Sequence, residues 1–298
     1  MCPCHRLRIG TAKCECSGEG TFKTRVFKEN YHGSKTVRNR RKPTRTSCTI
    51  MCQCHRLKIG TARCESFEDG TFKTRVFKEN STMAPKLYVI AASPPVRAVQ
   101  LCASAIDLKL EQQDVNLLKM EHLKPEYLKI NPQHTVPSLD DNGFILWDSH
   151  AIMTYLINKY GKDDSLYPKE AKARGLIDQR LFFDAGTLFP RMLVITKSII
   201  FQGVKSIPKE QSDAVIEAYG YVENYLEKTK FVAGNNVTIA DFSLVTTVTS
   251  CDLVVPIDAT KFPKIAAWIK KMEQLPYYDV NKVGLDMLRA TIKSKLEN

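Results

Sequence analysis

Hydrophobic positions along the chain change their period several times after residue 83, and each change predicts a different element. An apolar, β-branched run at residues 86–90 has the length of a buried strand, and beyond two prolines the apolar positions recur at helical spacing over residues 94–105. Proline suits the first turn of a helix, because its missing N–H is not needed there. The stretch therefore predicts strand, turn and helix, with Ser93 just outside the helix.

The next segments predict a small mixed sheet with helices. A strand is expected at residues 110–116, a short helix near residues 125–129, and two strands at residues 138–140 and 144–146. Asn-Gly between the last two supplies the positive φ angles of a tight hairpin turn. Asp148 then caps a further helix. The order βαβ, α, ββα is that of a compact α/β domain.

From residue 171 the pattern is helical to the end of the chain. Periodic segments are predicted at residues 171–201, 209–228, 240–253, 265–274 and 283–296. Thr238 and Asp241 have the spacing of a capping box ahead of the third segment, which is a structural role. We therefore predict an α/β domain at residues 83–163 and an all-helical domain at residues 171–298, with a ligand cleft between them.

The first 82 residues form a basic leader built from a tandem repeat. Residues 1–30 recur at residues 51–80 with 23 of 30 positions identical. The leader holds 18 lysines and arginines against 7 acidic residues and eight of the ten cysteines, whereas the remaining chain has a net charge of +1. A nearly neutral body argues against nucleic-acid binding. Its two isolated cysteines, Cys102 and Cys251, fit a reducing cytoplasm.

Three interpretations of the leader stay open. Its Cys-x-Cys-His pattern suggests zinc knuckles, but the gap is tighter than usual and the second copy has Ser66 where the first has Cys16. The spacer between the repeats has the Arg, Ser and Thr content of a transit peptide, although both repeats contain acidic residues. We favour a disordered leader, or upstream sequence joined to a product that begins at Met83. We expect no metal, and no apolar run approaches the roughly 18 residues of a membrane span.

Ser93 is the first candidate for chemistry. A helix N-cap is the ordinary role of a serine at this position, but Pro95 removes one of the two amides that a capping hydroxyl satisfies. The hydroxyl is then left to donate to an anion ahead of the helix N-terminus, which carries about half a unit of positive charge. No Gly-x-Ser-x-Gly elbow surrounds it, so we discount an acyl-enzyme nucleophile. Stabilising a bound thiolate is the better use.

Two loop features could hold an extended peptide beside Ser93. A cis bond between Val136 and Pro137 would present the backbone N–H and C=O of Val136 to such a ligand, although prolines at strand starts are usually trans. His122 and His134 lie on polar loops, where they can meet a carboxylate. Each of these histidines alone is more often an ordinary surface residue.

The start of the next predicted helix offers a third feature. Asp148, Ser149 and His150 provide N-terminal amides and a hydroxyl for a carboxylate, and Asp148 is available to an ammonium group. Together with the loop features, they suit a short zwitterionic peptide that bears a thiol.

Apolar side chains on the first long helix could line a cavity for an electrophile beside the thiolate. The candidates are Phe189, Met192, Leu193, Thr196 and Phe201. Helical stripes of this kind also form cores, and that alternative stays open.

At this point residues 83–298 resemble an insect cytosolic glutathione transferase, closest to the epsilon class, with the delta class as the near relation. The motifs that carry the resemblance are LYVIAASPPVRAV, EHLKPEYLKINPQHTVPSL, DDNGFILWDSHAIMTYLINKYGKDDSLYP, VTIADFS and QLPYY. The resemblance implies a thioredoxin-like N-terminal domain, an all-α C-terminal domain, a cytoplasmic homodimer, and glutathione as co-substrate without a metal. The leader has no part in it.

The resemblance also implies a role for each candidate. Ser93 would donate to the glutathione thiolate, His122 and His134 would hold the glycine end, Val136 the cysteinyl backbone across cis-Pro137, and Asp148, Ser149 and His150 the γ-glutamyl end. The implied activity is conjugation of glutathione to small hydrophobic electrophiles in xenobiotic detoxification. The alternatives are a non-catalytic carrier of hydrophobic ligands and a glutathione-dependent peroxidase. Epsilon relatives that handle bulky chlorinated substrates carry an arginine and an acid where this chain has Leu193 and Lys197, so the resemblance implies general conjugation and leaves insecticide dehydrochlorination open.

Overall fold

The computed structural model describes residues 83–297 and six short strands within the first 82 residues, and its contacts divide the chain into two units, Met1–Thr82 and Met83–Asn298. The first unit contains the strands β1 (Arg8–Ile9), β2 (Ala12–Cys16), β3 (Phe22–Val26), β4 (Cys48–Ile50), β5 (Ala62–Ser66) and β6 (Phe72–Val76). They pair as two antiparallel sheets, β1-β2-β3 and β4-β5-β6. The hypotheses of a disordered leader, zinc knuckles and a transit peptide concern parts of this unit outside the described residues.

The second unit begins with a four-stranded mixed sheet. Its strands are β7 (Lys86–Val89), β8 (Glu111–Asp114), β9 (Ser138–Asp141) and β10 (Phe144–Trp147), in the order β10-β9-β7-β8. The central strand β7 runs parallel to β8 and antiparallel to β9. Leu87 and Val89 of β7 are fully buried, as the apolar run predicts. The thioredoxin-like arrangement implied by the resemblance is confirmed.

The hairpin between β9 and β10 has the turn chemistry that the sequence predicts. Asn142 and Gly143 both have positive φ, 55° and 93°, which Asn and Gly adopt at low cost. This turn sets the register in which Trp147 lies opposite Ser138, and α3 starts two residues after Trp147.

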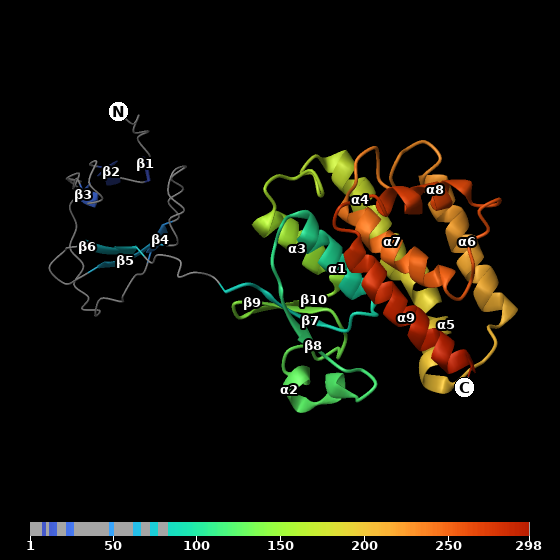
Figure 1. Ribbon diagram of the computed structural model, residues 1–298. Coiled ribbons are helices and arrows are strands. Elements are labelled where there is room, and N and C mark those ends of the chain that lie inside the picture. The colour runs from blue at the N-terminus through green and yellow to red at the C-terminus, as the bar shows by residue number, and fades with distance from the viewer. Residues whose placement is uncertain are drawn as a thin grey trace, which may run out of the picture. The chain divides into compact units, whose positions relative to one another are not determined.

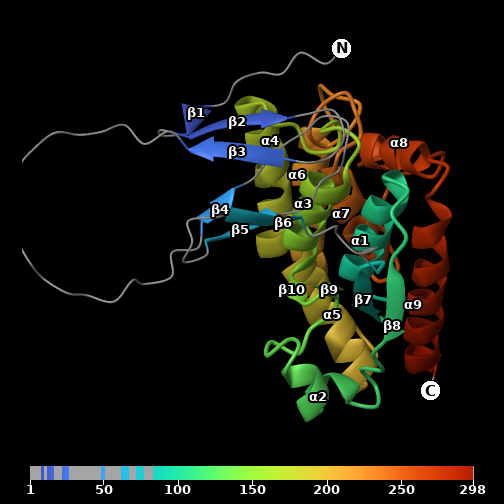
Figure 2. The same cartoon turned by 90° about the vertical axis from the view of Figure 1, so that its left-hand side faces the viewer.

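The helices of the second unit surround the sheet and continue as a bundle (Figures 1 and 2). They are α1 (Pro94–Ala105), α2 (Pro125–Leu128), α3 (Ser149–Tyr160), α4 (Ala171–Phe183), α5 (Phe189–Gln202), α6 (Lys209–Tyr225), α7 (Ile239–Asp252), α8 (Pro263–Met272) and α9 (Asp279–Glu297), with a 3₁₀ turn η1 (Glu121–Leu123). α1 and α3 cover one face of the sheet, and α2 lies beyond its other face. α1 also packs against α7 and α9, so the sheet and the bundle share a core.

The long helix predicted at residues 171–201 is continuous but not uniform. A π-helical segment, η2 (Asp184–Leu188), separates α4 from α5. Pro190 has no N–H for the carbonyl of Gly186 four residues earlier, so the regular α-helical ladder is broken at this point. Periodicity alone does not reveal this local widening.

The central helix of the bundle is α7, whose residues from Ile239 to Cys251 are all buried. The capping box predicted at its start is confirmed. The Asp241 carboxylate accepts from the Thr238 N–H at 2.9 Å, the Val232 N–H at 3.0 Å and Trp268 Nε1 at 3.1 Å. These bonds fix the helix that faces α1.

No helix in the described part of the chain is long and apolar enough to cross a membrane.

Candidate functional site

Ser93 ends the turn between β7 and α1. Its N–H donates to the Ile90 carbonyl at 2.9 Å, and its carbonyl accepts from the Arg97 N–H at 3.1 Å. The residue is half-buried with an extended backbone (φ −70°, ψ 123°), and its side chain makes no cap hydrogen bond. The prediction that the hydroxyl is not used as an N-cap is therefore confirmed. The hydroxyl lies where the N-terminus of α1 favours an anion.

The peptide bond between Val136 and Pro137 is cis, in agreement with the hypothesis. Pro137 is buried and Val136 is half-buried, just before β9 begins at Ser138. Val136 takes part in no backbone hydrogen bond of the described residues. Its N–H and C=O are therefore open to pairing with an extended ligand.

The structure brings His122 and His134 together. Their ring centroids are 6.0 Å apart, although the residues lie on η1 and on the loop after α2. Burial and the neighbouring His134 lower the pKa of His122, so its ring is neutral at pH 7. His122 Nδ1 is buried without a hydrogen-bond partner in the described structure. Such an orphaned polar atom fits a missing ligand group.

Asp148 caps α3, as predicted. Its Oδ1 accepts from the N–H groups of His150 at 2.9 Å and Ala151 at 3.1 Å, and also lies 3.3 Å from His150 Nδ1. Its Oδ2 accepts no hydrogen bond within the described residues. That second oxygen remains available to an ammonium group. Ser149, the first residue of α3, is buried beside it.

His150 is directed toward the helical bundle. Its Nε2 lies 2.9 Å from Ser243 Oγ on α7 and 3.3 Å from Asp184 Oδ2 on η2, and Ser243 Oγ donates to the same carboxylate oxygen at 2.5 Å. Burial lowers the pKa of His150, but the hydrogen bonds with Asp148 and Asp184 outweigh it and raise the pKa to about 9. His150 is therefore a cation at neutral pH.

Sequence reasoning missed Asp184 and Ser243 as members of this cluster. Asp184 is separated from His150 by 34 residues and Ser243 by 93, so no local pattern links them. The one available signal was the VTIADFS motif, which contains Ser243.

The residues predicted to line an electrophile pocket have different environments. Met192 and Thr196 are buried in the core, at 2% and 5% exposure, and the Thr196 hydroxyl donates to the Met192 carbonyl at 3.0 Å. Phe189 and Leu193 are half-buried, and Phe201 is 54% exposed. Phe189, Leu193 and Phe201 can contact a ligand without disturbing the core.

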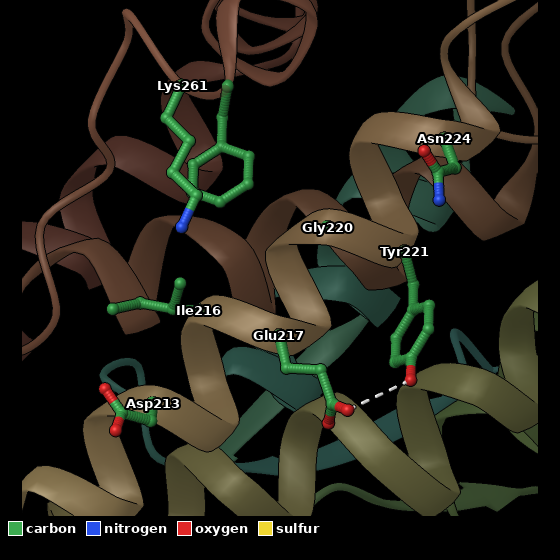
Figure 3. Close-up of a pocket in the computed structure, with 8 residues that line it drawn as sticks. Asp213, Ile216, Glu217, Gly220, Tyr221, Asn224 and Lys261 are labelled. Atoms are coloured by element: carbon green, nitrogen blue, oxygen red, sulfur yellow. Dashed lines mark hydrogen bonds between the residues drawn. The ribbon is translucent and has the colours of Figure 1, made fainter.

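A cavity of about 480 Å³ lies elsewhere, along α6 (Figure 3). Asp213, Glu217 and Tyr221 project from α6, with Lys261 opposite them, and Glu217 accepts from the Tyr221 hydroxyl at 3.2 Å. None of the predicted site residues lines this cavity.

Among the described residues, no group of three His, Cys, Asp or Glu side chains could hold a metal ion.

Comparisons with known proteins agree on one family. Two family profiles match the chain: "Glutathione S-transferase, N-terminal domain" at residues 87–164 and "Glutathione S-transferase, C-terminal domain" at residues 178–276. Glutathione S-transferase 1 of Manduca sexta is 43% identical over 217 residues, which are 72% of this chain and 100% of that protein.

Solved structures give the same result. An epsilon-class glutathione S-transferase from the housefly, Musca domestica, is 50% identical with a TM-score of 0.69 over 71% of this chain and 98% of its own. A glutathione transferase homologue from Drosophila mojavensis with bound glutathione is 50% identical with a TM-score of 0.70, over 71% of this chain and 97% of its own.

Proposed function

The chain belongs to the glutathione S-transferase family of enzymes, and from that premise we propose that it conjugates glutathione to small hydrophobic electrophiles, with Ser93 donating a hydrogen bond to the thiolate. One observation carries this role: the Ser93 hydroxyl lies at the N-terminus of α1 without a cap hydrogen bond. A free donor at a positive helix end is what a thiolate needs.

The energy required is within reach of these two groups. A thiol of pKa about 8.5 is only about 3% ionised at pH 7. Lowering its pKa by about 2 makes it mostly thiolate and requires about 2.7 kcal/mol. One hydrogen bond to a charged group contributes roughly 1.5 to 3 kcal/mol, and a helix end roughly 0.3 to 1 kcal/mol. Ser93 and α1 together can supply this stabilisation.

The rest of the tripeptide would be held by polar groups that have no hydrogen-bond partner among the described residues. We assign the cysteinyl backbone to Val136 beside cis-Pro137, because the N–H and C=O of Val136 lie outside the sheet ladder. The unpartnered Nδ1 of His122 supports a place for His122 and His134 at the glycine carboxylate.

We assign the γ-glutamyl end to Asp148, Ser149 and His150. The free Oδ2 of Asp148 suits the ammonium group, and the start of α3 suits the carboxylate. His150 then acts by holding Asp148 in place and adding positive charge to that end of the site.

Turnover of a chromogenic aryl halide with glutathione tests the proposal. Ser93→Ala should lower kcat/KM about tenfold or more, while glutathione still binds. Ser104→Ala is a matched control, since Ser104 is half-buried at the other end of α1, and it should leave turnover unchanged. Unchanged turnover in Ser93→Ala would remove Ser93 from the mechanism. A wild-type protein that binds hydrophobic ligands without any glutathione-dependent turnover would favour the carrier alternative.

We also propose that the enzyme is a homodimer. Leu176 and Phe182 of α4 are 46% and 75% exposed, and Phe144 of β10 is 49% exposed. Large exposed apolar side chains of this kind are typical of surfaces that a second subunit covers. Sedimentation should give twice the chain mass of 33.8 kDa, and a monomer would contradict the proposal.

We also propose a cytoplasmic location, because the free thiols of Cys102 and Cys251 suit a reducing compartment.

A further inference from the structure

The C-terminal helix α9 touches the turn that carries Ser93 at a glycine. Gly284 is buried, and a Cβ atom at this position would lie 2.2 Å from the carbonyl oxygen of Ala91 and 2.5 Å from Cδ of Arg97. Real Cβ atoms essentially never approach another atom closer than 3.0 Å. The backbone of α9 therefore lies against the backbone of the turn, two residues before Ser93, because Gly284 has no side chain.

A second contact between α9 and α1 lies one helical turn after Ser93. The Arg97 N–H donates to the Ser93 carbonyl at 3.1 Å, so Arg97 closes the first turn of α1. Its side chain is fully buried and donates to Asn281 Oδ1 on α9 and to Ser250 Oγ on α7 at 2.5 Å. Arg97 forms no ion pair with the described residues, so neutral groups of α7 and α9 hold its charge.

We propose that Gly284 is a positioning residue for the reaction. Its missing side chain lets α9 fix the turn from Ala91 to Ser93, and with it the distance from the Ser93 hydroxyl to the thiolate. The proposal rests on the role proposed above for Ser93 and adds a part of the molecule that is remote in sequence. The backbone of Gly284 packs against Ala91 before the serine, and Asn281 accepts a hydrogen bond from the Arg97 side chain after it.

A methyl group at Gly284 must move the turn or the helix. The distance to the Ala91 oxygen has to grow from 2.2 Å to at least 3.0 Å, and that oxygen is backbone, which cannot rotate away like a flexible side chain. Hydrogen bonds weaken steeply as their length and angle depart from the optimum. Misplacing a catalytic group by about 1 Å can cost on the order of 100-fold in rate.

Gly284→Ala and Gly220→Ala form a matched pair for the test. Both substitutions add a methyl group inside a helix, where alanine is favoured over glycine by about 1 kcal/mol, but a Cβ at Gly220 meets nothing within 4 Å. The readouts are the pH dependence of kcat/KM with an aryl halide, the KM for glutathione, and urea unfolding. Gly284→Ala should raise the apparent pKa of the bound thiol by about 1 and, through the smaller thiolate fraction, lower kcat about fivefold at pH 6.5. Its glutathione KM should stay within about twofold. Gly220→Ala should match the wild type in turnover, pH profile and KM, and should gain up to about 1 kcal/mol of stability in urea unfolding.

A double variant separates this proposal from the role of Ser93. In a Ser93→Ala background, Gly284→Ala should have no further effect on the pH profile, because it acts through the missing hydroxyl. If Ser93→Ala alone leaves the profile unchanged, the proposed function of Ser93 fails. If Ser93→Ala shifts the profile and Gly284→Ala does not, only the positioning role is overturned.

Asn281→Ala keeps the test decisive if Gly284→Ala does not fold. It leaves Gly284 in place and removes one hydrogen bond to Arg97. It should raise the thiol pKa in the same direction with a smaller, about threefold loss of kcat at pH 6.5. A wild-type pH profile in a folded Asn281→Ala protein would overturn the positioning role of α9.

Discussion

The cluster around His150 gives the chain a stability that depends on pH. His150 lies between Asp148 and Asp184, with only 17% of its side chain exposed, and its pKa rises from 6.5 to about 9 on folding. A group whose pKa is higher in the folded chain stabilises it fully below the unfolded pKa, and this stabilisation is lost as the pH rises through the folded pKa. At about 1.4 kcal/mol per tenfold change in proton affinity, the protonated His150 contributes about 3 kcal/mol near pH 6.

His150→Gln removes the cation and leaves the buried carboxylate of Asp184 with Ser243 alone. By linkage, the positive charge of His150 should make the free energy of unfolding of the wild type exceed that of this variant by about 3 kcal/mol at pH 6 and about 2 kcal/mol at pH 7.5. At pH 9.5 this contribution should be almost zero. Urea unfolding at these three pH values measures the difference. Asp184→Asn should flatten the pH dependence in the same way. A difference between wild type and His150→Gln that stays constant from pH 6 to pH 9.5 would refute this reasoning.

Three further predictions concern other parts of the chain. Asp141 is buried and accepts hydrogen bonds from Lys159 Nζ at 2.6 Å and from two tyrosine hydroxyls at 2.7 Å. Asp141→Asn should therefore lower the free energy of unfolding in urea by about 3 kcal/mol at pH 7, and a decrease below about 0.5 kcal/mol would contradict this. Although burial raises the pKa of Asp141, these hydrogen bonds lower it to about 2, so the wild type should lose this stability as the pH falls from about 4 toward 2. Phe201→Ala should raise the KM for an apolar aryl halide about fivefold and leave that for glutathione unchanged; equal values for the halide would place Phe201 outside the pocket. A chain that begins at Met83 should keep its turnover within about twofold, because Met83–Asn298 is a compact unit by itself, and a large loss would give the leader a role.

Local signals made the turn that carries Ser93 predictable. The two prolines and the apolar periodicity predicted α1 at Pro94–Ala105, and the structure has the same bounds. Pro95 also gave the reason why the hydroxyl of Ser93 is not a cap. The hairpin turn at Asn142 and Gly143 followed from the residues that tolerate positive φ. In each case the physical cause lies within a few residues of its effect.

Contacts between distant segments were not predictable from the sequence. Arg97 is a charged residue inside a helix, and nothing nearby in sequence indicates that Ser250 and Asn281 bury it. In the sequence, Gly284 is only a glycine inside a helical pattern, where it lowers helix stability. Its close packing against the carbonyl of Ala91 is visible only in the structure. The partners of His150 were missed for the same reason. Side-chain partners depend on how the sheet and the bundle pack, which periodicity does not determine.

If Ser93 keeps the sulfur of bound glutathione ionised, as we propose, the ultraviolet absorbance of the bound thiolate must depend on pH and on the Ser93 hydroxyl. Glutathione bound to the wild type should show an apparent thiol pKa near 6.5, about 2 below that of the free thiol, and glutathione bound to Ser93→Ala a value at least about 1 higher. Identical titration curves for the two proteins, both saturated with glutathione, would contradict it.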